Sequence, residues 1–554
     1  MRRHTFRLAL ALLLAGPAAL SAQEPAPPEP DPVQEAVRTR LEAPEALLAA
    51  GQVLYATTAL PAFYERQGYA PVWVRDAAPT PMARRLVREI ARADAEGLRP
   101  EDYHLEAVRR LVRETTAGEA DDPAGAAADL ELLLSDAFLV LGSHYLSGRV
   151  DPASVHSEWV ANRRSGDMAA VLAAALVSGE PALALQALLP PQPGYARLKQ
   201  ALTLYRTVQA RGGWPGIDPG PALHPGDEGP RVAQLQARLI AGRDLAPDAD
   251  STGVYGDATE AAVRAVQRRH GLDADGVVGA GTLAGLNEPV EARIRQVVLN
   301  MERWRWLPQE LGERYILVNI ANYELELVEA GRAALTMRVA VGRPYRRTPV
   351  FSDLMTHLVL SPYWHVPTNL AVQDKLPEIR RQGVGWFARN RMKVFQGWGS
   401  AEREVDPAAI DWSRLGAADF PYRLRQEPGP ANALGRVKFM FPNRFNVYLH
   451  DTPGREVFQQ TERAFSSGCI RVEKPMELAL YLIGDQGWTT ERIQAVVDAR
   501  VERTVNLTAP VPVYLLYWTA WADPDGTLNF RRDIYDRDAP LAAGLAEPPP
   551  RSGR

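Results

Sequence analysis

The chain has 554 residues, of which 46% are hydrophobic and 23% charged, and its formal net charge is −4. This length exceeds what one compact core normally holds, so we expect two to four domains in a globular protein. The small negative charge gives no electrostatic reason to expect a nucleic-acid partner.

The N-terminus predicts export. Residues 1–22 begin with three arginines in the first seven positions, continue with an apolar run and end in small residues around Ser21. The run is too short to span a bilayer, which is typical of a secretory signal peptide; an uncleaved membrane anchor is the alternative. We therefore expect a periplasmic protein with no stable membrane span in the mature chain. Residues 23–45 are Pro-rich and predict a linker.

Residues 46–210 predict a helical scaffold domain. They are rich in Ala and Leu, and apolar side chains recur at helical spacing. The clearest single face is formed by Leu130, Leu133, Leu134, Ala137, Phe138, Leu141 and Tyr145. Such a region is expected to provide surfaces for packing and few residues for catalysis.

Residues 222–287 contain a short internal repeat. The segments 252–263 and 275–286 share the pattern Gly-Val-x-Gly-x-x-Thr at a spacing of 23 residues. The glycines suit a tight turn, and each Thr is expected to cap the helix that follows. The pattern predicts a small three-helix module that resembles the peptidoglycan-binding domain; a packing module without a ligand is the alternative.

From about residue 312 the apolar pattern changes from helical to alternating. Residues 312–510 hold β-branched runs separated by Gly and Pro, which predict a mainly β domain. The segment 368–440 is expected to be an irregular insertion, rich in Trp and basic residues. Long insertions are usually lids or binding loops, and a surface decoration is the alternative. Residues 511–540 are expected to form a C-terminal extension packed on the β domain.

Cys469 is the only cysteine, and His450 precedes it by nineteen positions. Apolar and polar side chains alternate in residues 445–451, which predicts a half-buried strand with His450 on the face away from the core. The same alternation in 469–473 places Cys469 and Arg471 on the outer face of a second strand. If the two strands are neighbours, they present the thiol and the imidazole to one cleft.

Export narrows the role of this thiol. Exported proteins usually pair their cysteines, but a chain with one cysteine cannot form an internal disulfide. Cys469 is then either a small inert hydrophobe or a nucleophile. A thiol with a pKa near ~8.5 is mostly protonated at neutral pH, so an imidazole that takes its proton lets the sulfur attack a carbonyl carbon. Gly468 allows a close backbone bend, and N–H groups there could hold the oxyanion.

No competing chemistry stands out in the sequence. His357 and His365 have no Cys or acidic residues at metal-ligand spacing, so we expect no metal site. A phosphate-cradling Gly-rich loop and a Gly-x-Ser-x-Gly elbow are both absent. We therefore expect no cofactor.

The segments "YLHDTP" (448–453) and "RAFSSGCIRVEKP" (463–475) closely resemble the signature of L,D-transpeptidases with a YkuD-type catalytic domain. Ser467 stands where the widespread form has a second histidine, as in the large YcbB-like Gram-negative branch. Further segments resemble that branch in the expected order: 60–74, 96–105, 147–152, 300–308, 361–371 and 519–538. The expected fold is thus multidomain α+β, with a helical scaffold, a peptidoglycan-binding-like module and a mainly β YkuD-type domain that carries a capping insertion.

The resemblance implies an enzyme that acts on the tetrapeptide stems of peptidoglycan as donor and acceptor. Cys469 would form a thioester with the stem and release D-Ala, and the amine of a second stem would then complete a 3→3 cross-link. His450 would act as base, and the N–H groups of Gly468 and Cys469 would bind the oxyanion. Cell-wall synthases are expected partners, and carbapenems are expected acylating agents.

Several further residues are candidates for stem binding. Arg471 suits a stem carboxylate, although a structural strand cation is equally compatible with its position. The other candidates are Ser467, Tyr448, Asn446 and Trp364. Two other functions stay open at this point: an L,D-carboxypeptidase that uses water as acceptor, and a non-catalytic cell-wall-binding scaffold.

Overall fold

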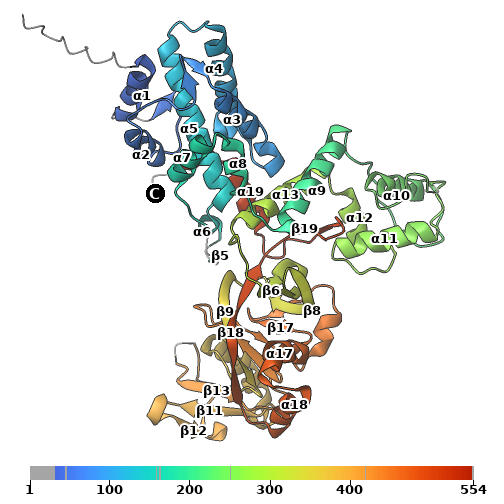
Figure 1. The fold of residues 1–554 in the computed structure, drawn as a ribbon. Coiled ribbons are helices and arrows are strands. Elements are labelled where there is room, and N and C mark those ends of the chain that lie inside the picture. Colours follow the sequence, from blue (N-terminus) through green and yellow to red (C-terminus); the bar gives the residue numbers. More distant parts are fainter. Residues whose placement is uncertain are drawn as a thin grey trace, which may run out of the picture.

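The computed structural model describes residues 31–43, 47–156, 159–160, 164–249, 251–417 and 419–551 (Figure 1). The predicted signal peptide and the first residues of the linker lie outside these ranges. Within them, no helix has the length and apolar character needed to cross a membrane. Figure 1 shows a helical part at the N-terminal end, a smaller helical module beside it, and a β domain at the opposite end of the molecule.

The helical part is built around α5 (Pro123–Ser147), most of whose residues are buried. Asp122 caps its start by accepting from the N–H of Gly125. Buried Glu131 on α5 accepts the N–H groups of three successive residues and the Tyr64 hydroxyl. The elements around it are α1 (Pro32–Glu42), β1 (Leu48–Ala49), β2 (Gln52–Val53), α2 (Ala59–Arg66), β3 (Val74–Arg75), β4 (Ala78–Pro79), α3 (Pro81–Ala91), α4 (Leu105–Ala117), α6 (Pro152–Val155), α7 (Met168–Ser178) and α8 (Pro181–Gln186).

The small module contains α10 (Pro230–Ala241), α11 (Asp257–Arg269) and α12 (Ala280–Asn287). In each of its two repeats, a glutamine side chain forms the same pair of hydrogen bonds. Gln236 accepts the Gly253 N–H and donates to Thr259, and Gln267 accepts the Gly276 N–H and donates to Thr282. The expectation that these threonines cap the helices is wrong, because Gly256 and Gly279 are the N-cap residues and both threonines are buried against the glutamines.

The β domain contains one sheet that closes on itself, because β14 pairs with both β15 and β9. The long strand β18 (Arg503–Leu516) lies between β6 and β9 and is parallel to β6. Helices α17 (Pro475–Ile483) and α18 (Thr490–Ala499) cover the sheet. The other strands are β5 (Trp159–Val160), β6 (Arg314–Asn319), β7 (Glu324–Glu329), β8 (Arg332–Gly342), β9 (Val350–Leu360), β14 (Val437–Met440), β15 (Leu449–His450), β16 (Ala464–Ser466) and β17 (Ile470–Val472).

The insertion is a folded subdomain, so the expectation of an irregular stretch is wrong. Four strands form its sheet, in the order β10 (Trp364–His365), β13 (Tyr422–Gln426), β11 (Met392–Gln396) and β12 (Arg403–Val405). They pack with α14 (Thr368–Leu370), a π-helical turn (Ala371–Lys375), α15 (Leu376–Gln382) and α16 (Gly385–Arg389). Aromatic residues of the insertion, such as Trp386, Phe387 and Trp412, fill a separate core. We call this unit the capping insertion.

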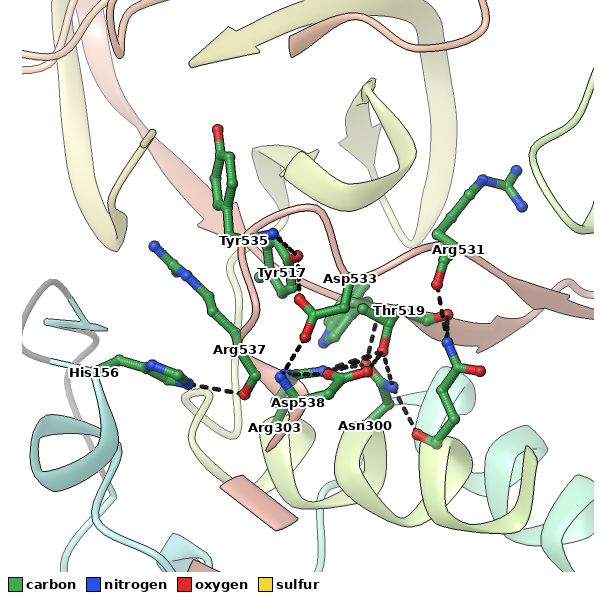
Figure 2. A network of polar contacts seen from close by, with 12 residues as sticks. His156, Asn300, Arg303, Tyr517, Thr519, Arg531, Asp533, Tyr535, Arg537 and Asp538 are labelled. Carbon is green, nitrogen blue, oxygen red and sulfur yellow. Dashed lines mark hydrogen bonds and ion pairs between the residues drawn. The ribbon is translucent and has the colours of Figure 1, made fainter. Parts of the chain in front are cut away.

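The predicted start of the C-terminal extension at residue 511 is wrong, because residues 511–516 belong to β18 and pair with β6 and β9 in the sheet. The extension begins after this strand. It contains β19 (Ala520–Ala522), β20 (Leu528–Phe530) and α19 (Asp538–Ala546), and it contacts α9 (Pro193–Ala210) and α13 (Val290–Arg305). Figure 2 shows the polar network at this junction, where fully buried Arg303 forms an ion pair with Asp538 at 2.6 Å. The His156 ring also contacts the Arg537 carbonyl, so the helical part shares this network.

Candidate active site

Two adjacent strands position the histidine and the cysteine. β15 and β17 pair in parallel, with Leu449 opposite Ile470 and His450 opposite Arg471. Leu449 and Ile470 are fully buried in the core. Since side chains alternate along a strand, His450, Arg471 and the residue just before β17, Cys469, lie on the other face. The sequence prediction that both reactive side chains leave the core on one side agrees with this register.

The first of these strands is shorter than expected. β15 covers only Leu449–His450, and Asn446 has a φ of +54° in the preceding loop. Asn446 therefore does not lie on the outer face of a strand, as its position in the alternation had suggested. It reaches the thiol through its backbone instead, because the Asn446 carbonyl lies 3.8 Å from the Cys469 sulfur.

The Cys469 thiol is half-buried and is not part of a disulfide. Burial raises the pKa of Cys469, and this outweighs the opposing effects of Tyr448, Lys438 and Arg471. The thiol form is therefore favoured at neutral pH. Lys438 lies on β14 opposite His450, with its ammonium 4.0 Å from the centre of the Tyr448 ring. The strand alternation around Val437 and Phe439 could have revealed Lys438, had β14 been recognised as a neighbour of β15.

His450 is 5% exposed, and its Nδ1 lies 2.6 Å from the Asp451 carbonyl oxygen. A carbonyl only accepts hydrogen bonds, so Nδ1 carries the proton and Nε2 keeps its lone pair. Burial lowers the pKa of His450 to about 3, helped by the positive charges of Arg471 and Lys438 and opposed by the Asp451 contact. The imidazole is therefore neutral at pH 7 and able to accept a proton at Nε2.

The orienting residue Asp451 was missed in the sequence. Its carboxylate accepts from the backbone N–H and Nε of Arg436, at 2.9 and 2.8 Å, and pairs with Arg455. These contacts hold the carbonyl that receives the Nδ1–H of His450. The position directly after the histidine was the only sequence signal for this role.

The loop before Cys469 has a constrained backbone. Gly468 has a φ of +115°, a conformation that residues with a Cβ rarely adopt. Its N–H donates to Ser466 Oγ at 3.1 Å, and its carbonyl accepts from Thr348 Oγ1 at 2.9 Å. The Gly468 N–H is thus already engaged, which differs from the oxyanion role expected for it. The described hydrogen bonds leave the N–H of Cys469 unused, and this group can still serve that role.

Ser467 connects the loop to the capping insertion. Its side chain is exposed, and its hydroxyl accepts from Arg346 at 3.0 Å. The same guanidinium binds both carboxylate oxygens of Asp374 and the side chain of Gln373, which lie in the π-helical turn of the insertion. Arg346 and Asp374 were not identified from the sequence, because nothing in it indicates that positions 28 residues apart meet beside Cys469.

The remaining candidates are divided between the sheet and the insertion. Arg471 is partly buried, and its Nε has no partner among the described residues, which leaves a donor for a ligand. Tyr448 lies edge-on to His450, with ring centres 5.7 Å apart. Trp364 lies on β10 and packs with the core of the capping insertion and Lys375. No contact in the described part of the chain joins Trp364 to Cys469. The same part holds no cluster of His, Cys, Asp and Glu side chains suited to a metal ion.

Three family models match the chain. They are a scaffold domain at residues 58–202, a putative peptidoglycan binding domain at residues 228–286 and an L,D-transpeptidase catalytic domain, YkuD, at residues 313–494. The chain carries an L,D-transpeptidase catalytic domain. The three matches also confirm the predicted fold class, because the helical region, the small module and the mainly β transpeptidase domain follow one another as expected.

Similarity to individual L,D-transpeptidases is partial. A putative L,D-transpeptidase of Haemophilus influenzae is 36% identical over 258 residues, which cover 46% of this chain and 50% of that protein. The chain therefore spans about half the length of the curated relative it matches. The solved L,D-transpeptidase of Xylanimonas cellulosilytica (residues 123–326) is 17% identical, with 54% of this chain and 99% of that chain covered and a TM-score of 0.18. The Ldtfm–avibactam carbamoyl enzyme is 12% identical, with 38% and 51% covered and a TM-score of 0.17. Scores this low carry no argument about the site.

Proposed function

We propose that the chain is an exported cysteine L,D-transpeptidase that forms 3→3 cross-links between peptidoglycan stem peptides. The supporting observation is the placement of His450 and Cys469 on one face of adjacent strands, with Nδ1 of His450 held by Asp451. An imidazole in this tautomer can take the thiol proton at Nε2.

The first half-reaction acylates the enzyme. As Cys469 Sγ attacks the carbonyl carbon of the third stem residue, its proton passes to His450 Nε2 and the carbonyl oxygen becomes an oxyanion that the Cys469 N–H can bind. His450 then gives the proton to the amine of D-Ala, the carbon–nitrogen bond breaks, and a thioester remains. Burial favours the neutral thiol and imidazole, so proton transfer and attack are expected to be coupled.

The second half-reaction transfers the acyl group. The side-chain amine of a second stem attacks the thioester, His450 takes a proton from this nitrogen, and the sulfur leaves as the thiol after recovering that proton. Arg471 and Ser467 lie next to the thiol and could bind a stem carboxylate or amide. The substrate lies outside the cytoplasm, which agrees with the export proposed from residues 1–22. A cell-wall synthase that supplies stems is part of the same proposal.

An acylation experiment tests this function. After meropenem treatment, intact-mass spectrometry should show one covalent adduct on the full chain and none on Cys469→Ala. A folded chain without an adduct would favour a non-catalytic wall-binding scaffold. Incubation with disaccharide-tetrapeptide should then give cross-linked dimers; tripeptide products without dimers would instead identify an L,D-carboxypeptidase.

A further inference from the structure

A cleft of about 1240 Å³ lies between the small module, α13, the β domain and the C-terminal extension. Its walls include His270 from the end of α11, Arg293 from α13, Tyr323 from the turn before β7, Arg463 and Arg531. Neither Cys469 nor His450 lines it. The cleft is therefore a second hollow, separate from the candidate active site.

The lining of this cleft is strongly cationic, with seven arginines and four acidic residues. Three of the arginines bond only to neutral acceptors among the described residues. Arg463 donates to four backbone carbonyls, those of Val339, Tyr323, Gln460 and Thr461. Arg531 donates to the Asn322 side chain and two carbonyls, and Arg293 donates to the Gln296 side chain and the Gly285 carbonyl. Their charges are thus left without a bonded carboxylate.

Burial without a paired anion is unfavourable for a guanidinium. Burial lowers the pKa of Arg293 and Arg463, and lowers that of Arg531 to about 10. Glu473 acts on Arg463 and Asp523 acts on Arg531 through space, but only Glu324 acts on both arginines. Glu324 is itself affected, since burial raises its pKa to about 7. A carboxylate brought by a ligand would relieve the uncompensated positive charge.

A second observation also indicates a ligand. Tyr323 is 6% exposed, and its hydroxyl is buried with no hydrogen-bond partner in the described part of the chain. The Arg463 guanidinium lies 5.3 Å from the centre of the Tyr323 ring, so the unused hydroxyl and the uncompensated charge belong to one wall. Buried polar groups of this kind normally have partners, and a ligand in the cleft can supply one.

The orientation of Arg531 agrees with this arrangement. Figure 2 shows its carbonyl directed toward the buried network, where it accepts from Gln296, and its guanidinium pointing away from that network. The side chain contacts Gly271 of the small module closely, because a Cβ at Gly271 would lie 2.6 Å from Arg531 Cδ. This wall of the cleft therefore forms where the small module meets the C-terminal extension.

The cleft also adjoins the segment that precedes Cys469 in the sequence. Arg463 immediately precedes β16 (Ala464–Ser466), which ends three residues before Cys469. In the same loop, Thr461 bonds to Asp273 of the small module. A ligand bound to Arg463 would thus contact the module and the strand before Cys469 together.

We propose that this cleft binds a carboxylate-bearing stem peptide of peptidoglycan, at a site separate from that of the reacting stem. Arginine forks bind carboxylates in a bidentate manner, and the Tyr323 hydroxyl can donate to the same group or to a peptide carbonyl. The identity of the ligand rests on the proposed function. The site would hold a neighbouring stem of the wall while Cys469 acts on another.

Co-sedimentation with isolated sacculi tests the proposal. All chains carry Cys469→Ala, so that no covalent step contributes and binding at the active site is the same in each. The combined Arg293→Gln and Arg463→Gln replacement should weaken binding to intact sacculi by at least ~10-fold, as expected for the loss of charge-assisted hydrogen bonds. Arg109→Gln is the matched control, because Arg109 is exposed and paired with Glu106 on α4; it should bind as the parent does.

Two further arms identify the ligand. Sacculi stripped of stem peptides by an amidase should bind the parent and the double variant equally weakly, and free stem tetrapeptide should compete with intact sacculi. Tyr323→Phe removes one hydroxyl and keeps the ring, so a ~3-fold loss is expected from one hydrogen bond, even if the double variant folds poorly.

Unchanged binding by Tyr323→Phe and the double variant, or equal binding of the parent to intact and stripped sacculi, would overturn the proposal. The co-sedimentation measurement does not depend on whether Cys469 forms an acyl-enzyme, because all chains in it carry Cys469→Ala. If meropenem forms no adduct but the double variant binds sacculi more weakly than the parent, only the transpeptidase function is overturned. If the adduct forms normally but the variants bind sacculi as the parent does, only the proposed binding site is overturned.

Discussion

Arg346 binds both carboxylate oxygens of Asp374, at 2.6 and 2.7 Å, and the same guanidinium donates to Ser467 Oγ at 3.0 Å. Arg346 lies in the loop between β8 and β9, Asp374 in the capping insertion, and Ser467 two residues before Cys469. One side chain thus connects the insertion to the loop that carries the nucleophile. The position of the insertion and the reactivity of the thiol should therefore be coupled.

Asp374→Asn should slow acylation of Cys469 because it frees Arg346 and loosens the insertion. The pair is bidentate and partly buried, so a double-mutant cycle with Arg346→Gln should give a coupling energy of ~1 kcal/mol, at the upper end for partly exposed ion pairs. The cycle compares the acylation rates of the parent, the two single variants and the double variant, each measured by mass spectrometry. Lys393→Gln, which breaks the exposed pair with Glu404 in the same insertion, should leave the rate unchanged. Additive effects of the Arg346 and Asp374 replacements would show that the insertion is not coupled through this pair.

Arg471→Gln should raise the pKa of both reactive groups. The Arg471 charge lowers the pKa of Cys469 and of His450, so its removal disfavours the thiolate and favours the imidazolium. The pH profile of iodoacetamide alkylation should move to higher pH in this variant. Arg403→Gln, at an exposed position of β12, is the control. A profile that stays in place would mean that solvent screens Arg471 from the sulfur.

The depressed pKa of His450 gives a pH dependence of stability. The folded chain holds this imidazole neutral down to about pH 3, while an unfolded chain protonates it near its ordinary value of 6.5. Between these values the unfolded state binds the extra proton, so this contribution to stability is present above pH 6.5 and is lost as the pH falls. The unfolding free energy of the wild type should fall relative to His450→Gln by up to ~1.4 kcal/mol per pH unit in this window. Denaturant titrations of both chains at several pH values measure it, and a difference that is constant with pH would contradict the assigned shift.

Gly468→Ala should impair both stability and acylation. A Cβ at this position has room, since the nearest atoms lie 3.6 and 4.0 Å away, so the cost comes from the backbone at φ +115°. Strain of this kind costs about 1–3 kcal/mol or is relieved by movement of the loop before Cys469. Gly487→Ala is the control, because its φ is +74°, a Cβ there meets nothing within 4 Å, and it lies away from the site. It should lower the melting temperature while acylation persists; normal acylation by Gly468→Ala would show that the loop does not require this backbone shape.

Asp538→Ala should release the C-terminal extension from α13. Arg303 is fully buried, and Asp538 is the carboxylate paired with it in the network of Figure 2. Leaving a buried cation unpaired typically costs about 3–5 kcal/mol. Hydrogen exchange of residues 520–546 should therefore accelerate strongly, whereas Glu106→Gln, which breaks an exposed pair, should change nothing there. Unaltered exchange in Asp538→Ala would mean that the extension is held by apolar contacts alone.

The sequence predicted local features well where one physical pattern dominates. Helical spacing around Leu134 indicated a buried helix, and alternation around Leu449 and Ile470 indicated which side chains leave the core. The sequence did not predict features that arise when several distant segments pack into one unit. The insertion appeared irregular because its core combines residues as distant as Val366 and Leu424, and the roles of Thr259 and Thr282 depend on glutamines in preceding helices.

By itself the sequence determined the order of the regions, the single thiol and the face on which Cys469 and His450 lie, since these follow from composition and from the two-residue period of a strand. Only the tertiary structure decided what surrounds them. Packing brings together the groups that set the tautomer of His450, bond the Gly468 N–H and form the Arg346–Asp374 pair. It also forms the cleft lined by Arg293, Arg463 and Arg531. Charge and burial act through space, so the pKa values that govern the chemistry depend on the fold as well as on residue type.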